Sequence, residues 1–497
     1  MGEKMELYIN KKISHKKLIG MIERLRNNGT ELHAFELYCG NELMVRAGAA
    51  PYSVYDKRQM FSVSKSFTAT AVAIAEEMGL LRVSDRVADI FKEESRGVTD
   101  SNLLNMTVEN LLTMTTGHDE CVMTAYELLD TDNPFFSEEP SGAISQSENG
   151  AEAFFKRKVL HKPGSFFKYN TGASYMLSAI ITKLTGLTLL DFLMEKLFAP
   201  LDITPACWTA SAGRINEGGI GLHISCDDLA RFGLMYLNGG VYNGKRIISS
   251  DWVERASAPH SYDLRDNQTE DWRAGYGYQF WKCAKEGYRA DGFGGQWCII
   301  IPEKELVFAA VSESGGMQRD IETYYEWFDN CMTAEGEKAD IEKTKVYFSE
   351  LYLPRSDSSI VKIEKEIYKA EDNLQKITFI GIETDNSGTL TLSLSDGVKI
   401  HTVKAGRGVM IENSIELPNM KPAIVALTPK NRCERARFAA SWSVNNDKIE
   451  IKVRFIDSHF SGKYIISREN DRLHFELDFP KESIYREARK IEAVRIG

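Results

Sequence analysis

The chain has 497 residues, a length at which a large domain accompanied by a smaller one is expected rather than a single core. Its formal net charge of −10 leaves no surplus of Lys and Arg to neutralise a phosphate backbone, so we expect no nucleic-acid partner. We expect no membrane role either, because no stretch is both apolar and long enough for a transmembrane helix.

The first residues lack the continuous apolar run of a secretory signal, so we expect a cytoplasmic location. Eight cysteines are scattered singly and form no C-x-x-C pair, which predicts reduced and mostly buried thiols. No metal ion or organic cofactor is expected.

The N-terminal half begins with a helical pattern over residues 14–26. Residues 31–47 predict two strands around the turn Gly40-Asn41-Glu42. An Ala-rich helical pattern then covers residues 62–81, and further helical spacing occurs at 107–113, 173–185, 189–197 and 226–237. The middle of the chain is therefore predicted to be helical.

Strand patterns return at residues 276–283, 288–293, 297–301 and 306–312, followed by a helix over 319–332. These elements predict an α+β fold with one antiparallel sheet, built from N-terminal and later strands and flanked by helices, with a helical region inserted between the strands. We assign this domain to residues 1–335.

A polar segment, residues 333–345, is typical of a surface linker. Beyond it, β-rich runs at 377–380, 390–394 and 449–453 alternate with turn sequences such as Ser395-Asp396-Gly397. Residues 346–497 are therefore predicted to form a small all-β domain, either a sandwich or a barrel.

The sequence Ser62-Val63-Ser64-Lys65 lies where an extended segment gives way to a helix. A spacing of three places Ser62 and Lys65 on one helix face. A serine hydroxyl becomes a good nucleophile when a neighbouring base accepts its proton, and an amine does so when its surroundings keep part of it neutral. Backbone N–H groups at the helix start would also favour a developing oxyanion.

Several other segments occur in a consistent order around this motif. They are Phe61-Ser62-Val63-Ser64-Lys65-Ser66-Phe67, Leu111-Leu112-Thr113-Met114-Thr115-Thr116-Gly117-His118, Pro163-Gly164-Ser165-Phe166-Phe167-Lys168-Tyr169-Asn170-Thr171-Gly172, Pro200-Leu201-Asp202 and Asp227-Asp228-Leu229-Ala230-Arg231-Phe232-Gly233. Together they resemble the serine β-lactamase and penicillin-binding protein family, particularly its class C and esterase-like branch. The resemblance covers about residues 14–332.

This resemblance implies a catalytic role for Tyr169, which takes the place of the family tyrosine that moves protons among nucleophile, lysine and leaving group. The sequence departs from the family at the next position, because Asn170 and Thr171 stand where Ser and Asn are expected. The substrate-binding amide is then either replaced by the Thr171 hydroxyl or supplied by Asn170.

The third family motif corresponds to Phe293-Gly294-Gly295-Gln296. Its glycines, Gly294 and Gly295, would let a substrate approach the strand, and the Gln296 N–H would join the Ser62 N–H as an oxyanion donor. Phe293 stands where the family has a cation, so substrates with a free carboxylate are less expected. Arg289 could compensate only if no bulge separates it from the face of Phe293.

The function expected from these residues is a serine hydrolase that cleaves a small-molecule ester, amide or peptide through an acyl-enzyme on Ser62. One alternative is a weakly catalytic or inactive binding protein on the same scaffold. Another is an unrelated hydrolytic site that includes His118, Asp227 and Asp228. His118 reads better as a structural or rim residue, and the two aspartates read as a helix N-cap pair.

Overall fold

The computed structural model describes residues 7–121, 147–204, 207–211, 213–332, 341–352, 362–373, 375–415, 436–478 and 490–496. The chain divides into two units. The larger unit ends at Thr344, and the smaller contains Lys345–Gly497. Each unit is described by itself.

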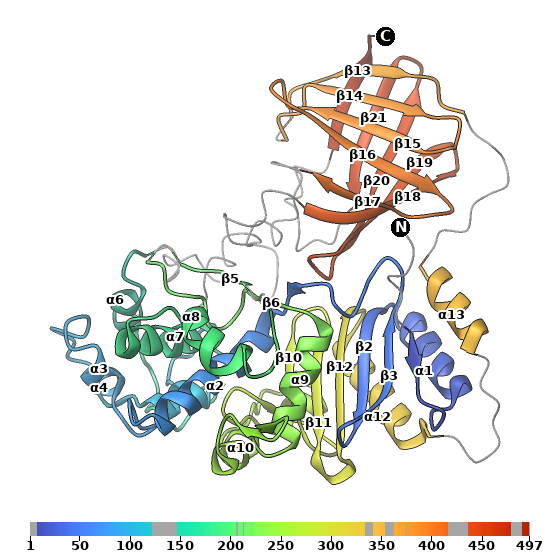
Figure 1. Ribbon diagram of the computed structural model, residues 1–497. Coiled ribbons are helices and arrows are strands. Elements are labelled where there is room, and N and C mark those ends of the chain that lie inside the picture. Colours follow the sequence, from blue (N-terminus) through green and yellow to red (C-terminus); the bar gives the residue numbers. More distant parts are fainter. Residues whose placement is uncertain are drawn as a thin grey trace. The chain divides into compact units, whose positions relative to one another are not determined.

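The larger unit is organised around an antiparallel sheet of seven described strands in the order β1-β3-β2-β12-β11-β10-β9 (Figure 1). The strands are β1 (Tyr8–Ile9), β2 (Glu31–Cys39), β3 (Glu42–Gly48), β9 (Trp281–Lys282), β10 (Tyr288–Gly292), β11 (Gln296–Ile301) and β12 (Leu306–Glu313). The N-terminal hairpin joins the later strands where β2 pairs with β12. This arrangement confirms the predicted α+β fold.

Helices cover both faces of the sheet, which explains why β11 is buried along its whole length. On one face, Tyr324 of α12 (Met317–Asn330) packs against Phe308, with ring centroids 4.7 Å apart. On the other face lies α9 (Cys226–Leu237), where a Cβ at Gly233 would come within 2.6 Å of Val307 and 2.8 Å of Cys298 Sγ. Glycine therefore lets α9 approach the strands closely. The N-terminal helix α1 (His15–Asn27) lies against α12.

The inserted helical region surrounds α2 (Ser64–Glu77), whose residues from Ser64 to Ala75 are all buried. Its small Ala and Thr side chains suit a helix packed on every side. The other helices of the larger unit are α3 (Val87–Ile90), α4 (Ser101–Asn105), α5 (Val108–Leu112), α6 (Gly150–Phe155), α7 (Thr171–Thr185), α8 (Leu189–Leu193), the π-helical turn η4 (Met194–Phe198), α10 (Ser250–Ser257) and α11 (Glu270–Arg273).

Short strands complete the larger unit. They are β4 (Arg58–Gln59), β5 (Cys207–Trp208) and β6 (Leu222–Ile224), which pair with one another, and the hairpin of β7 (Val241–Tyr242) and β8 (Lys245–Arg246). No single helix among the described residues is long and apolar enough to cross a membrane. Helix α7 and the segment formed by α8 and η4 would together be long and apolar enough, but the chain bends by 74° between them.

One predicted strand, residues 276–283, is wrong for most of its length, because β9 contains only Trp281–Lys282. Gln279 has a positive φ of 61°, which a strand does not accommodate. Its side-chain amide donates to the carbonyl oxygens of Leu111 and Leu112, and its side-chain oxygen accepts from Ser174. These partners from distant helices hold the chain in a turn.

The smaller unit contains ten described strands in the order β16-β15-β14-β13-β22-β21-β20-β19-β18-β17. A parallel pairing of β16 with β18 joins the two ends of this order, so the predicted all-β domain is barrel-like. The strands are β13 (Glu366–Ala370), β14 (Phe379–Thr384), β15 (Leu390–Ser395), β16 (Ile400–Arg407), β17 (Ile411–Ile415), β18 (Ala436–Asn445), β19 (Lys448–Phe455), β20 (Ser461–Glu469), β21 (Arg472–Asp478) and β22 (Lys490–Arg495).

The predicted linker lies partly outside the described residues, at positions 333–340. Its last residues begin α13 (Ile341–Glu350), which the sequence did not predict. Of the cysteines, Cys433 lies outside the described residues. The seven described cysteines are free thiols, and four of them are buried: Cys226, Cys283, Cys298 and Cys331.

Candidate active site

The Ser62 side chain is carried by a single 3₁₀ turn, η1 (Phe61–Val63), which leads directly into α2. The preceding residue, Phe61, is buried and has a φ of 46°, a conformation that non-glycine residues rarely adopt. Such backbone strain persists when the surroundings fix it, and it is common at functional sites. The structure therefore places Ser62 in a fixed turn just before the helix.

Strand β10 comes very close to this turn. A Cβ at Gly292 would lie 2.4 Å from the carbonyl oxygen of Met60, so only glycine allows this approach. The ring of Phe293 meets that of Phe61 edge-on, with centroids 5.8 Å apart. The end of β10 thus forms one side of the Ser62 site.

Lys65 lies one turn after Ser62 and faces the same way, as the spacing predicted. Its Nζ donates to Ser62 Oγ at 3.1 Å and to the carbonyl oxygen of Gly219 at 2.9 Å. The side chain is buried, with 1% exposed, and this burial lowers the pKa of Lys65 to about 7. A substantial fraction of the amine is therefore neutral near neutral pH and able to accept a proton.

Tyr169 lies beside Lys65, whose Nζ is 4.7 Å from the centre of the tyrosine ring. The ring stacks on Trp281 at 5.7 Å and meets Tyr276 edge-on. Burial among these rings raises the pKa of Tyr169, and a hydrogen bond with Ser62 only partly offsets that effect. The phenol therefore stays protonated at neutral pH and can donate a proton.

Asn170 and Thr171 stand at the beginning of α7. Asn170 is fully buried and caps this helix, because its side-chain oxygen accepts the N–H of Gly172 at 3.0 Å. Its amide nitrogen is 3.5 Å from Thr116 Oγ1. The Asn170 side chain is thus used within the fold, whereas the methyl group of Thr171 lies against Gly219, beside Lys65.

Residues 292–295 form the tight turn between β10 and β11, with the Gly295 N–H donating to the Gly292 carbonyl oxygen at 3.1 Å. Phe293 is 50% exposed at the tip of this turn. By contrast, a Cβ at Gly295 would lie 2.1 Å from Ser312 Oγ, and the buried Gln296 side chain donates to the Ser312 carbonyl oxygen. The turn thus brings Phe293 to the Ser62 site and packs Gly295 and Gln296 against β12.

Arg289 is completely buried and does not present its guanidinium to a substrate. Its Nε donates to Asp291 Oδ2 at 2.9 Å, and its Nη1 donates to the Lys282 carbonyl oxygen at 2.5 Å. The carboxylate of Asp291 interacts electrostatically with Lys65 and opposes the lowering of its pKa. Nothing in the sequence pattern points to Asp291, because an acidic residue in a strand carries no signal of what lies next to it.

The residues of the alternative hydrolytic site have structural partners. His118 is buried, its Nδ1 is 2.9 Å from Thr116 Oγ1, and burial lowers its pKa to about 4. Asp227 pairs with Arg46 and Arg231. The prediction that Asp227 and Asp228 form the N-cap of α9 is wrong, because the cap is Ser225. Both aspartates lie in the first turn of the helix, and Asp228 completes a capping box with Ser225.

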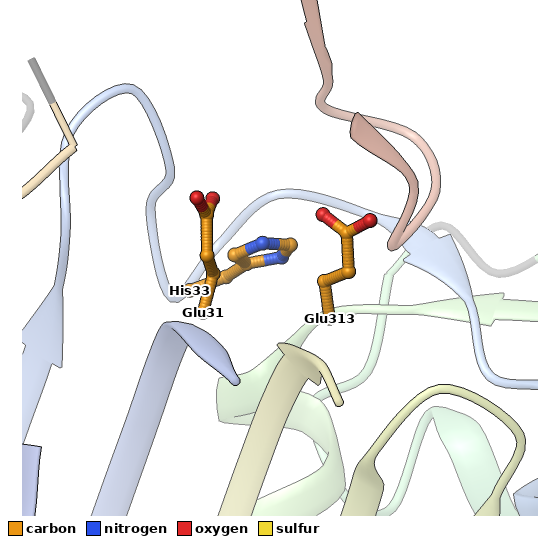
Figure 2. Close-up of side chains that lie close together, drawn as sticks. All are labelled: Glu31, His33 and Glu313. Carbon is orange, nitrogen blue, oxygen red and sulfur yellow. The ribbon is translucent and has the colours of Figure 1, made fainter. Parts of the chain in front are cut away.

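A second cluster of titratable side chains lies at the ends of β2 and β12. Figure 2 shows the ring of His33 between the side chains of Glu31 and Glu313. A ring nitrogen of His33 and one carboxylate oxygen from each glutamate lie within 4.8 Å of one another. His33 Nδ1 is 2.9 Å from Arg58 Nη1. Because a guanidinium only donates, Nδ1 accepts, and the proton of a neutral His33 resides on Nε2. Neither ring nitrogen then offers a lone pair to a metal, and we assign no metal ion to this cluster.

The Beta-lactamase family model matches residues 40–329. Over 306 residues the chain is 24% identical to the 6-aminohexanoate-dimer hydrolase of Paenarthrobacter ureafaciens, which covers 60% of this chain and 76% of that protein.

Two solved structures are similar in fold. One, a Bacteroides dorei protein assigned as a beta-lactamase, has a TM-score of 0.53 and 15% identity, covering 64% of this chain and 100% of that one. The other, EstCE1, a hydrolase with promiscuous acyltransferase activity, has a TM-score of 0.50 and 14% identity, covering 62% of this chain and 98% of that one. At these identities the similarity shows a shared fold.

Proposed function

We propose that this chain, which belongs to the beta-lactamase family of serine hydrolases, cleaves a small ester or amide through an acyl-enzyme formed on Ser62. The observation that carries the proposal is the contact between Lys65 Nζ and Ser62 Oγ, 3.1 Å apart, with the lysine buried. A base of pKa about 7 within hydrogen-bond reach of a serine hydroxyl is what nucleophilic catalysis requires.

In the first step, neutral Lys65 takes the proton from Ser62 Oγ as the oxygen attacks the substrate carbonyl carbon. Tyr169, kept protonated by its surroundings, donates its proton to the leaving alcohol or amine. Lys65 then returns a proton to the phenolate. A water molecule hydrolyses the acyl-enzyme by the same groups acting in reverse, which restores Ser62.

The tetrahedral oxyanion needs backbone N–H donors. The N–H of Ser62 is one candidate, because it lies in the turn that starts α2. The sequence predicts the Gln296 N–H as the second donor. The contacts of Gly292 with Met60 and of Phe293 with Phe61 support the Phe293 N–H as another candidate for that position.

Substrate recognition differs from that of penicillin-type enzymes in this proposal. The exposed, apolar Phe293 ring replaces a cation, and the buried Arg289 does not compensate. Of the two residues considered for the family asparagine, Asn170 is engaged in capping α7, which supports Thr171 as the residue facing the substrate. The name of the Paenarthrobacter relative, a 6-aminohexanoate-dimer hydrolase, supports a small-molecule substrate.

The test is covalent labelling with a fluorophosphonate, read by intact mass. Wild-type protein should gain one adduct, and Ser62→Ala should gain none at the same reagent concentration. Ser84→Ala, which removes an exposed serine away from the site, serves as the matched control and should label like the wild type. Equal labelling of Ser62→Ala and wild type would refute the assignment of the nucleophile.

A further inference from the structure

The ion pair of Arg289 and Asp291 lies on the strand that borders Ser62. The two side chains are two residues apart on β10 and point to the same face, with Nε and Oδ2 2.9 Å apart. The next two residues after Asp291 contact the Ser62 turn, Gly292 against Met60 and Phe293 against Phe61. The pair therefore lies directly beside the proposed reaction site.

Both members of this pair are buried, and only Asp291 keeps some exposed side-chain surface. Arg289 has no exposed side-chain surface, and its Nε, Nη1 and Nη2 donate to Asp291, the Lys282 carbonyl oxygen and the Asp271 carbonyl oxygen. The Asp291 side chain is 7% exposed. Within the described part of the chain, Arg289 is its one hydrogen-bond donor and uses Oδ2, so Oδ1 keeps its capacity to accept.

The charges around Arg289 do not cancel. A second buried carboxylate, Asp271, lies 3.7 Å from Arg289 Nη1 and accepts hydrogen bonds from Tyr325, Gln318 and the Ala284 N–H. One guanidinium thus faces two carboxylates. Burial raises the pKa of the Asp291 carboxyl, and Arg289 and Lys65 oppose that effect by favouring the carboxylate.

Asp291 also lies near the catalytic groups. It interacts electrostatically with Lys65 and with Tyr169, which lie on α2 and just before α7. Phe293, which follows β10, is half exposed and offers no positive charge to a substrate. The end of β10 thus brings one apolar ring and one nearby carboxylate to the side of Ser62.

We propose that Asp291 determines specificity by binding a protonated amine on the acyl part of the substrate, close to the scissile carbonyl. This inference rests on the proposed acyl-enzyme chemistry at Ser62. A substituent that carries an ammonium group gains a charge-assisted hydrogen bond at Oδ1, whereas a carboxylate at the same place is repelled by Asp291. The substrate class is thus amino-acyl esters or amides rather than acids.

Three ethyl esters of nearly equal shape test this inference: alanine ethyl ester, ethyl isobutyrate and the monoethyl ester of methylmalonic acid. They place an ammonium, a methyl and a carboxylate on the same carbon. Ethanol release gives kcat/KM for each, divided by the rate of its hydroxide-catalysed hydrolysis to remove differences in intrinsic reactivity. The order expected for the wild type is ammonium, then methyl, then carboxylate.

Asp291→Asn keeps the size of the side chain and an acceptor for Arg289 while it removes the charge. We expect the ammonium-to-methyl ratio to fall about tenfold, the effect of losing one charge-assisted hydrogen bond. Any change in the Lys65 pKa acts on all three esters and cancels in the ratio. Glu303→Gln, which removes an exposed carboxylate in the turn after β11, is the matched control and should leave the ratio unchanged.

The outcomes separate the two proposals. Turnover that depends on Ser62, with the same ratio in wild type and Asp291→Asn, would overturn the role of Asp291 and leave the acyl-enzyme chemistry intact. Turnover of the esters that survives in Ser62→Ala would overturn the proposed function itself. Should Asp291→Asn fail to fold, the order of the three normalised rates in the wild type still decides the inference, because a preference for the carboxylate ester contradicts it.

Discussion

Replacing Lys65 with methionine should inactivate the protein and, at neutral pH, stabilise it. Methionine has a similar length and no charge, so it fits an interior site that is 99% shielded from solvent. Removing a general base lowers turnover on the order of 10²-fold or more. The variant should be more stable because folding of the wild type must bury the Lys65 amine, which costs free energy.

Burial lowers the pKa of Lys65 from its ordinary value of 10.5 to about 7. The unfolded chain therefore binds a proton that the folded chain releases, and the wild type gains stability as pH rises between these values. This difference in pKa lowers the free energy of unfolding of the wild type by about 4 kcal/mol at pH 7. At pH 9 the same penalty is only about 2 kcal/mol. Methionine escapes this penalty, but it loses the hydrogen bonds to Ser62 and Gly219, roughly 2 kcal/mol together.

We therefore expect Lys65→Met to be about 2 kcal/mol more stable than the wild type at pH 7 and nearly equal to it at pH 9. Urea unfolding of both proteins at the two pH values, followed by the fluorescence of buried tryptophans such as Trp252 and Trp297 in the larger unit, measures the difference. A stability difference that does not change with pH would refute the lowered pKa. It would also remove the physical basis for Lys65 as the base.

The remaining predictions concern turnover. Ser62→Ala should abolish hydrolysis of a small activated ester with the fold intact by circular dichroism, and activity retained in pure mutant protein would contradict the assignment. The kcat/KM of the wild type should rise with pH through an apparent pKa near 7, because Lys65 acts as a base only when neutral; a flat profile from pH 5 to 9 would argue against it. Tyr169→Phe should slow esters of poorly acidic alcohols more than nitrophenyl esters, since the phenol protonates the leaving group, and an equal loss for both would exclude that role. Phe293→Lys should raise kcat/KM for a carboxylate-bearing ester relative to a neutral one by about tenfold; an unchanged ratio would mean that Phe293 does not face the substrate.

Local patterns in the sequence were sufficient to predict most helices and strands of the larger unit. The apolar spacing of α9 predicted both of its ends, and the alternation of apolar runs with turn residues predicted β10, β11 and β12. The spacing of Ser62 and Lys65 likewise predicted their shared direction, because three residues along a helix correspond to nearly one turn. These features depend on neighbours in the chain, and such neighbours are visible in a sequence.

The tertiary structure decided what depends on residues far apart in the chain. Gln279 breaks a strand-like run because its amide is bound by carbonyl oxygens of α5 and by a serine of α7. The lowered pKa of Lys65 arises from burial by several elements, and no local pattern encodes how much water reaches a side chain. Asp291 influences the pKa of Lys65 because β10 passes the Ser62 turn at Gly292. The sequence by itself therefore determined most of the elements and the placement of Ser62 beside Lys65, whereas packing determined the charges that surround the two side chains.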